Sequence, residues 1–213
     1  MQRTAVVPTL SGLMAVVAVL VATWEHGIGT TADSATYLWG AKGLLDGSGY
    51  TGVTGSTIAV FPPLYSIVLI PISALEVDPW RAIGVLHAVL LGALVYVTVT
   101  WVTETTRSTV AGLGVAIAVG LGAPLVEATL YAWSELLFVL LTVLALAELG
   151  RVALDGRSPA RAAAWTALAL LTRYAGVALV GVGAIVMLLV TNDRHELRSR
   201  AQRAAAFVAI SVA

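Results

Sequence analysis

Cysteine is absent from the 213 residues, and lysine occurs once, at Lys42. The absence of cysteine excludes disulfide bonds and thiolate metal sites. Charge is also scarce: 11% of the residues are charged, whereas soluble domains carry about 25%. The formal net charge is zero, so nothing in the composition indicates a nucleic-acid partner.

The low charge content is matched by a high content of apolar residues. Hydrophobic residues make up 59% of the chain, and the mean hydropathy is +0.92. The long apolar runs lie at 8–23, 61–75, 81–101, 110–130, 134–149, 159–190 and 204–213. Because a helix needs about 20 residues to cross a bilayer, these runs predict an all-α, polytopic transmembrane helical bundle. We expect one transmembrane domain over residues 1–213.

The first run has two readings. A cleaved signal peptide is the alternative, but the basic start is weak and no small-x-small cleavage site precedes Trp24. The sequence therefore favours an uncleaved first helix with a cytoplasmic N-terminus in the cell membrane.

Two arginine-rich loops, 150–161 and 191–203, predict the topology. Both should be cytoplasmic by the positive-inside rule, so an even number of crossings separates them. This predicts two short passes in 159–190 with a reversal near Arg173 and Tyr174. Counting crossings back towards the N-terminus places residues 24–60 on the extracytoplasmic side. The segment 61–75 is then a juxtamembrane or re-entrant helix rather than a full crossing.

On this topology the outer side collects polar residues in short motifs. The motifs are DSATY at 33–37, AKGL at 41–44, GSGY at 47–50, FPPLY at 61–65, SELLF at 134–138 and LLTRYAG at 170–176. Their order and spacing resemble the GT-C membrane glycosyltransferases. The likeness is greatest to the family 39 group, which is related to dolichyl-phosphate-mannose protein mannosyltransferases and lipid A aminoarabinose transferases. The external first loop of that group contains a juxtamembrane helix, which this resemblance implies here.

The resemblance implies transfer of a sugar from a polyprenyl-phosphate donor to a lipid, glycan or protein acceptor on the extracytoplasmic side. Asp33 is then the catalytic carboxylate, since an acceptor hydroxyl needs a general base. Arg173 is the candidate for the leaving phosphate, because its planar fork pairs two phosphate oxygens. Glu135, Tyr37, Lys42 and Tyr174 complete the expected substrate-binding set. The resemblance implies no certain cofactor, and it leaves a divalent cation as an open alternative.

Each residue also has a structural reading. Asp33 could cap an interfacial helix, and Glu135 could stabilise a helix N-terminus. Arg173 could snorkel to the interface, and Lys42 could contact membrane lipid headgroups. Glu127 is a secondary candidate. Two histidines have structural readings: His87 is read as a buried hydrogen-bonding residue, and His26 lacks partners for a metal site.

Two functional alternatives remain at this point. One is a transporter or lipid flippase, although the sequence has no internal repeat of the kind that many transporters carry. The other is a non-catalytic, truncated relative, since the sequence ends about ten residues into the run at 204–213, too short to span. We expect the chain to be the N-terminal portion of a longer GT-C module.

Overall fold

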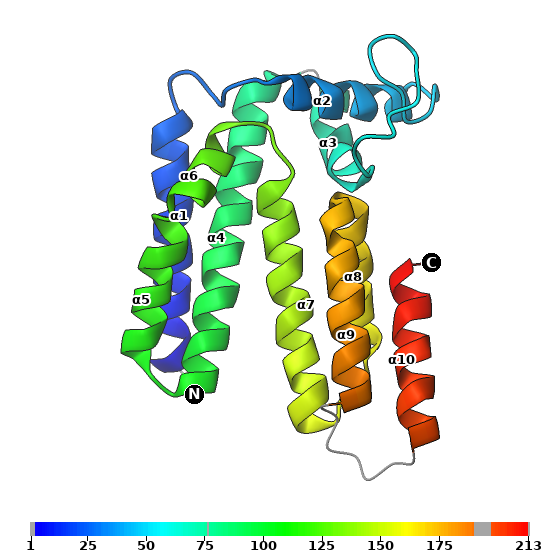
Figure 1. Ribbon diagram of the computed structural model, residues 1–213. Helices are drawn as coiled ribbons and strands as arrows, with labels where there is room; N and C mark the ends of the chain where they lie inside the picture. The colour runs from blue at the N-terminus through cyan, green and yellow to red at the C-terminus, as the bar shows by residue number, and fades with distance from the viewer. Residues whose placement is uncertain (1–2, 76, 190–196, 213) are drawn as a thin grey trace. The chain divides into compact units, whose positions relative to one another are not determined.

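The computed structural model describes residues 3–75, 77–189 and 197–212, and the secondary structure of this described part is helical, without strands. The helices are α1 (Arg3–Thr23), α2 (Ala32–Leu45), α3 (Leu64–Ala74), α4 (Pro79–Thr106), α5 (Thr109–Gly120), α6 (Ala123–Leu130), α7 (Glu135–Asp155), α8 (Ala160–Thr172), the 3₁₀ turn η1 (Tyr174–Gly176), α9 (Val177–Leu189) and α10 (Leu197–Val212). The expected all-α class is confirmed (Figure 1).

Three described helices are long and apolar enough to cross a membrane. They are Val6–Thr23 within α1, α4 and α7, and a fourth span results if α5 and α6 are counted together. These two helices are bent by 48°, whereas the sequence predicts one uninterrupted run at 110–130. The bend has a local cause, because Gly122 caps α6 and Pro124 occupies its first turn.

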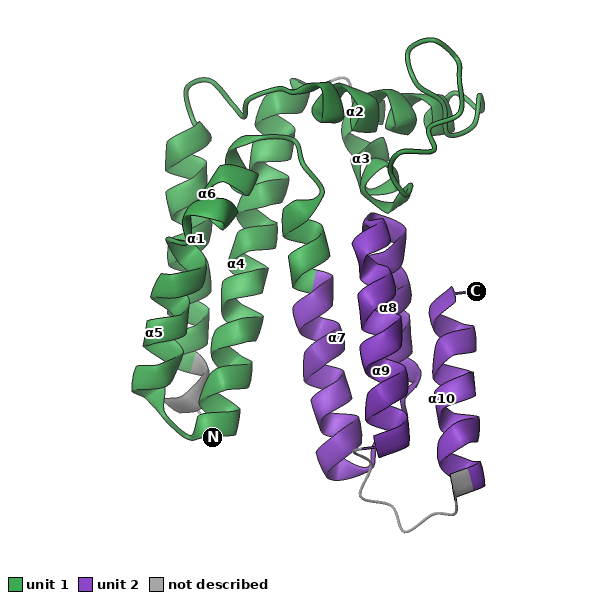
Figure 2. Cartoon of the chain, in the orientation of Figure 1, with its two compact units in different colours: residues 1–140 green, residues 141–213 purple. Residues whose placement is uncertain are grey.

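The chain forms two compact units, residues 1–140 and residues 141–213, and α7 runs from the first into the second (Figure 2). Each unit is described by itself. The expectation of a single transmembrane domain stays a prediction.

In the first unit, α1 and α4 lie side by side (Figure 1). Gly12 and Gly92 meet at the crossing: a Cβ on Gly12 would lie 2.9 Å from the Gly92 carbonyl oxygen. Small residues let helix backbones approach closely in lipid, where van der Waals packing drives helix association. Gly112 and Gly183 are packing positions as well, since added Cβ atoms would meet Thr103 and Phe207 respectively. Their neighbours Gly114 and Gly181 face open space.

Helix α2 lies crosswise to α1 and α4 and beside α3 (Figure 1). Its buried residues are Ser34, Tyr37, Gly40, Ala41 and Gly43. Helix α3 has 11 residues and rises only about 16 Å, about half of the 30 Å hydrocarbon core. The expectation that 61–75 is no full crossing is therefore supported by its length.

In the second unit, α8, η1 and α9 form a helical hairpin, and α10 packs against both helices. Its core is a cluster of buried residues from all four helices: Leu149, Val152, Ala162, Ala163, Met187, Ala204 and Phe207. The predicted reversal near Arg173 is confirmed. Helices α8 and α9 have 13 residues each and rise about 20 Å, so two full passes stay a prediction.

Candidate functional site

Asp33 lies in the first turn of α2, and Thr31 caps that helix. The Thr31 hydroxyl accepts from the Ser34 backbone N–H at 3.3 Å, and the Ser34 hydroxyl accepts from the Thr31 N–H at 3.1 Å. The reading of Asp33 as the helix cap is therefore wrong, because this reciprocal capping box already satisfies the cap. Asp33 is exposed, and its carboxylate takes part in no hydrogen bond or ion pair with any residue that the structure describes.

Tyr37, one turn further along α2, is the centre of the first unit's polar cluster. Its side chain is buried, with 1% of the residue exposed. The Tyr37 hydroxyl lies 2.9 Å from the Ser134 hydroxyl, at the start of α7. The Tyr37 ring also packs on Phe61 and Tyr65, with centroids 4.8 and 4.9 Å away. Three motifs that are far apart in the sequence thus meet at one side chain.

A second set of contacts joins the start of α2 to the segment before α7. The Trp133 indole N–H donates to the Thr31 hydroxyl at 2.9 Å. The Gly29 N–H donates to the Leu130 carbonyl at 2.6 Å, and Gly29 pairs with Tyr131 in an isolated bridge. Residues 29–31 and 130–133 therefore lie side by side, which holds the first turn of α2 in place.

Glu135 follows Ser134 directly and lies in the first turn of α7, as the sequence predicts. The residue is half-buried, and its Oε2 atom is shielded from solvent. Burial raises the pKa of Tyr65 above its usual range, and the nearby Tyr37 and Glu135 raise it further. Glu135 therefore lies close enough to Tyr65 to act on it electrostatically. Glu127, the secondary candidate, is exposed on α6.

His87 also belongs to this polar cluster. It is a buried hydrogen-bonding residue, as the sequence predicts. The residue is fully buried in α4. His87 Nδ1 lies 3.2 Å from the Thr129 carbonyl, and Nε2 lies 2.7 Å from the Tyr65 hydroxyl. A carbonyl only accepts, so Nδ1 carries the proton and Nε2 accepts from Tyr65. The chain Tyr65–His87–Thr129 connects α3, α4 and α6.

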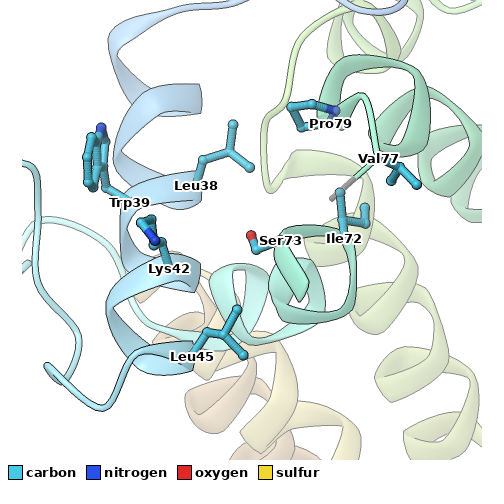
Figure 3. Close-up of a pocket in the computed structure, with 8 residues that line it drawn as sticks. All are labelled: Leu38, Trp39, Lys42, Leu45, Ile72, Ser73, Val77 and Pro79. Carbon is cyan, nitrogen blue, oxygen red and sulfur yellow. The ribbon is translucent and has the colours of Figure 1, made fainter. Parts of the chain in front are cut away.

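Lys42 lies at the other end of α2 from Asp33. Nine residues rise about 13 Å and turn about half a revolution, so the two side chains do not converge. Lys42 forms an ion pair with Asp46, with Nζ 2.9 Å from Oδ2. It also lines a groove of about 280 Å³ between α2 and α3, together with apolar residues and Ser73 (Figure 3). Across this groove Leu38 and Leu45 face α3.

Arg173 and Tyr174 belong to the second unit, at the tip of the α8–η1–α9 hairpin. Arg173 is half-buried and extended, with φ −149° and ψ 139°, and Tyr174 is 57% exposed. The tip is compact because a Cβ on Gly176 would come within 2.6 Å of the Leu170 backbone. The glycine of the LLTRYAG motif is thus required by the turn itself.

Sequence reasoning missed Ser134 and Tyr65 as members of the cluster, although both stand inside quoted motifs. Ser134 opens SELLF and Tyr65 closes FPPLY. The available signal was that each of these two motifs carries a hydroxyl residue at one of its ends. Among the described residues, no group of three His, Cys, Asp or Glu could hold a metal ion.

Comparisons with protein-family models, with curated proteins and with solved structures return no match to this chain.

Proposed function

We propose that the protein is a GT-C-like membrane glycosyltransferase that moves a sugar from a polyprenyl-phosphate carrier to an acceptor hydroxyl on the extracytoplasmic side. The observation that carries the proposal is the 2.9 Å contact between the Tyr37 and Ser134 hydroxyls. It joins the DSATY and SELLF motifs, 97 residues apart, which were selected from sequence order alone. Phe61 and Tyr65 of the FPPLY motif pack on the same tyrosine.

Asp33 is the proposed general base. The reaction forms a bond between the acceptor oxygen and the anomeric carbon and breaks the bond from that carbon to the phosphate oxygen. The proton of the acceptor hydroxyl passes to the Asp33 carboxylate, and the bonding electrons leave with the lipid phosphate. The exposure of Asp33, and its release from any capping role by Thr31, support this assignment. Glu135 is proposed to contact the substrate from the neighbouring helix end.

Lys42 is proposed to hold the carrier lipid rather than the reacting sugar. The groove beside it has apolar walls that suit a prenyl chain, and its ammonium group suits a phosphate or headgroup. The roles of Arg173 and Tyr174 at the carrier phosphate rest on the resemblance of the LLTRYAG motif.

The test measures polyprenyl phosphate, because every sugar donor of this class releases it when the sugar is transferred. The purified chain would be incubated with polyprenyl-phosphate-linked hexoses and pentoses and a membrane extract as the source of acceptors. Release of polyprenyl phosphate is measured by chromatography. Asp33→Asn keeps the shape of the side chain but removes the base, so we expect release to fall by about 100-fold or more.

Glu25→Gln is the matched control for this test. Glu25 is an exposed acid of the same loop, with 82% of its side chain accessible, so its variant should retain release. Equal release by wild type and Asp33→Asn would contradict the role of Asp33. An intact donor that merely changes sides in protein-containing vesicles would instead identify a flippase.

A further inference from the structure

A groove of about 550 Å³ lies in the second unit, between the start of α8 and one face of α10. From α10 it is lined by Ser199, Gln202, Arg203, Ala206 and Ile210. Spacings of three and four residues place these side chains on one stripe of the helix. None of them belongs to the motifs on which the proposed function rests, so the groove requires an explanation of its own.

The groove is polar and cationic at the end where α8 and α10 begin. Arg203 and Gln202 lie there with Ser158 and Ser199. The Ser199 hydroxyl oxygen is shielded from solvent and has no hydrogen-bond partner among the described residues. Helix α8 begins at this point without a side-chain cap, because its N-cap residue is Pro159; the Ala160 N–H reaches only Ser158 Oγ, at 3.4 Å. Helix amides, an arginine and hydroxyl donors together favour an anion with several oxygens.

The groove becomes apolar along α10. Ala206 and Ile210 continue the same stripe, and Ile210 is 44% exposed. A neighbouring face of α10 packs into the core through Ala204 and Phe207. The step from Ser199 to Ile210 covers about 16 Å of helix, with polar groups at one end and apolar ones at the other. This gradient fits an amphiphile better than a free ion.

The charge around the groove also favours an anionic partner. In the sequence of this end, the segments 148–161 and 191–203 together carry seven arginines and four acidic residues. Glu148 is buried and is bound by Arg151 at 2.8 Å and Arg161 at 3.2 Å. A surplus of arginine marks the end expected at the cytoplasmic leaflet, where anionic lipids concentrate.

We infer that this groove binds one anionic phospholipid of the cytoplasmic leaflet. Its phosphate lies at Arg203, Gln202 and the start of α8, and an acyl chain follows Ala206 and Ile210. This lipid is distinct from the sugar carrier and takes no part in the transfer reaction.

The test is lipid binding to the full chain in neutral detergent, followed by native mass spectrometry. The probes are phosphatidylglycerol and phosphatidylcholine with identical acyl chains. Wild type should retain one phosphatidylglycerol at least about tenfold more tightly than phosphatidylcholine. Arg203→Gln should remove about that factor, because a charge-assisted bond to phosphate is lost.

Arg198→Gln is the matched control, since Arg198 lies on the same helix, is exposed and does not line the groove. It should bind phosphatidylglycerol as wild type does. Ala206→Trp fills the apolar end and should weaken both lipids, and its helix content by circular dichroism shows whether it folds. Equal binding by the two arginine variants would overturn the proposal. Displacement of the lipid by millimolar inorganic phosphate would also overturn it, since the site would then select a free anion.

Discussion

Tyr37 shows how a single side chain organises the candidate site. Its hydroxyl contacts Ser134, its ring packs on Phe61 and Tyr65, and its backbone carbonyl accepts from the Ser66 hydroxyl at 2.9 Å. Removing one of these contacts leaves the others in place. The hydroxyl can therefore be tested without removing the aromatic core of the cluster.

Tyr37→Phe should lower the free energy of unfolding by about 1 kcal/mol, the usual net worth of a buried hydrogen bond. The change also leaves the Ser134 hydroxyl without this partner and loosens α2, so transfer should fall while Asp33 is intact. Both quantities can be measured on the same preparation, by denaturant titration in detergent and by polyprenyl-phosphate release.

Two further variants complete this experiment. Ser134→Ala alone and together with Tyr37→Phe forms a double-mutant cycle, in which the paired loss should be smaller than the sum of the single losses. Tyr96→Phe is the control, because Tyr96 is 42% exposed on α4 and no hydrogen bond of its hydroxyl is found among the described residues. Additive effects of Tyr37→Phe and Ser134→Ala would mean that the two hydroxyls do not stabilise each other.

At the residue scale the sequence predicted which residues begin helices better than it predicted their side-chain partners. Asp33 and Glu135 follow from the resemblance and from helix-start patterns. The capping role went to Thr31 instead of Asp33, because a serine three residues after a threonine makes the reciprocal box and the motif alone does not reveal it. Contacts such as Trp133 with Thr31 cross 102 positions, and local patterns carry no information on them.

Helices α1 and α4 approach each other closely at Gly12 and Gly92. A Cβ on Gly92 would meet Val16 and would lie 3.0 Å from the Gly12 carbonyl oxygen. These neighbours are helix backbone and a β-branched side chain, which yield little. The position therefore tolerates no added side chain without moving the helices apart.

Gly92→Val should destabilise the protein by about 1–3 kcal/mol, as expected for overpacking. Gly114→Val is the matched control, since nothing lies within 4 Å of a Cβ added there, and it should change stability by less than about 0.5 kcal/mol. Thermal unfolding of both variants in the same detergent measures the difference. Equal melting temperatures would show that α1 and α4 do not pack through this glycine.

Helix boundaries could be predicted where charged residues or the length of an apolar run mark them. The helical hairpin at Arg173 followed from charge parity, and the short α3 followed from the length of its apolar run. The bend between α5 and α6 was not anticipated, although Gly120, Gly122 and Pro124 were visible signals of a helix break. A mean hydropathy taken over about 20 residues does not change at such a short break. The bend was therefore not predicted from the length of the apolar run.

At the scale of the whole molecule, the number of membrane crossings between the two arginine-rich loops needs an experiment, since it is even in both of two arrangements. The positive-inside rule expects both arginine-rich loops on the same side, whether α8 and α9 cross the bilayer or only enter and return. The tip of the hairpin distinguishes the two cases, because α8 rises about 20 Å against about 30 Å of hydrocarbon. A shallow hairpin would leave the Arg173 turn inside the membrane.

The absence of cysteine makes this question accessible, since every introduced thiol is the sole target for labelling. Val53→Cys in the first loop and Ala175→Cys at the hairpin tip should react with a membrane-impermeant maleimide applied to intact cells. Thr105→Cys, at the end of α4, and Ser158→Cys should react only after permeabilisation. The positive-inside rule places the loop of Ser158 in the cytoplasm, and counting the expected crossings back from it places the end of α4 on the same side. All four positions are exposed or half-buried, so each thiol is reachable from the solvent on its own side. Labelling of Ala175→Cys by a permeant reagent alone would make the hairpin re-entrant, and labelling of Thr105→Cys from outside would invert the topology and remove Asp33 from the extracytoplasmic face.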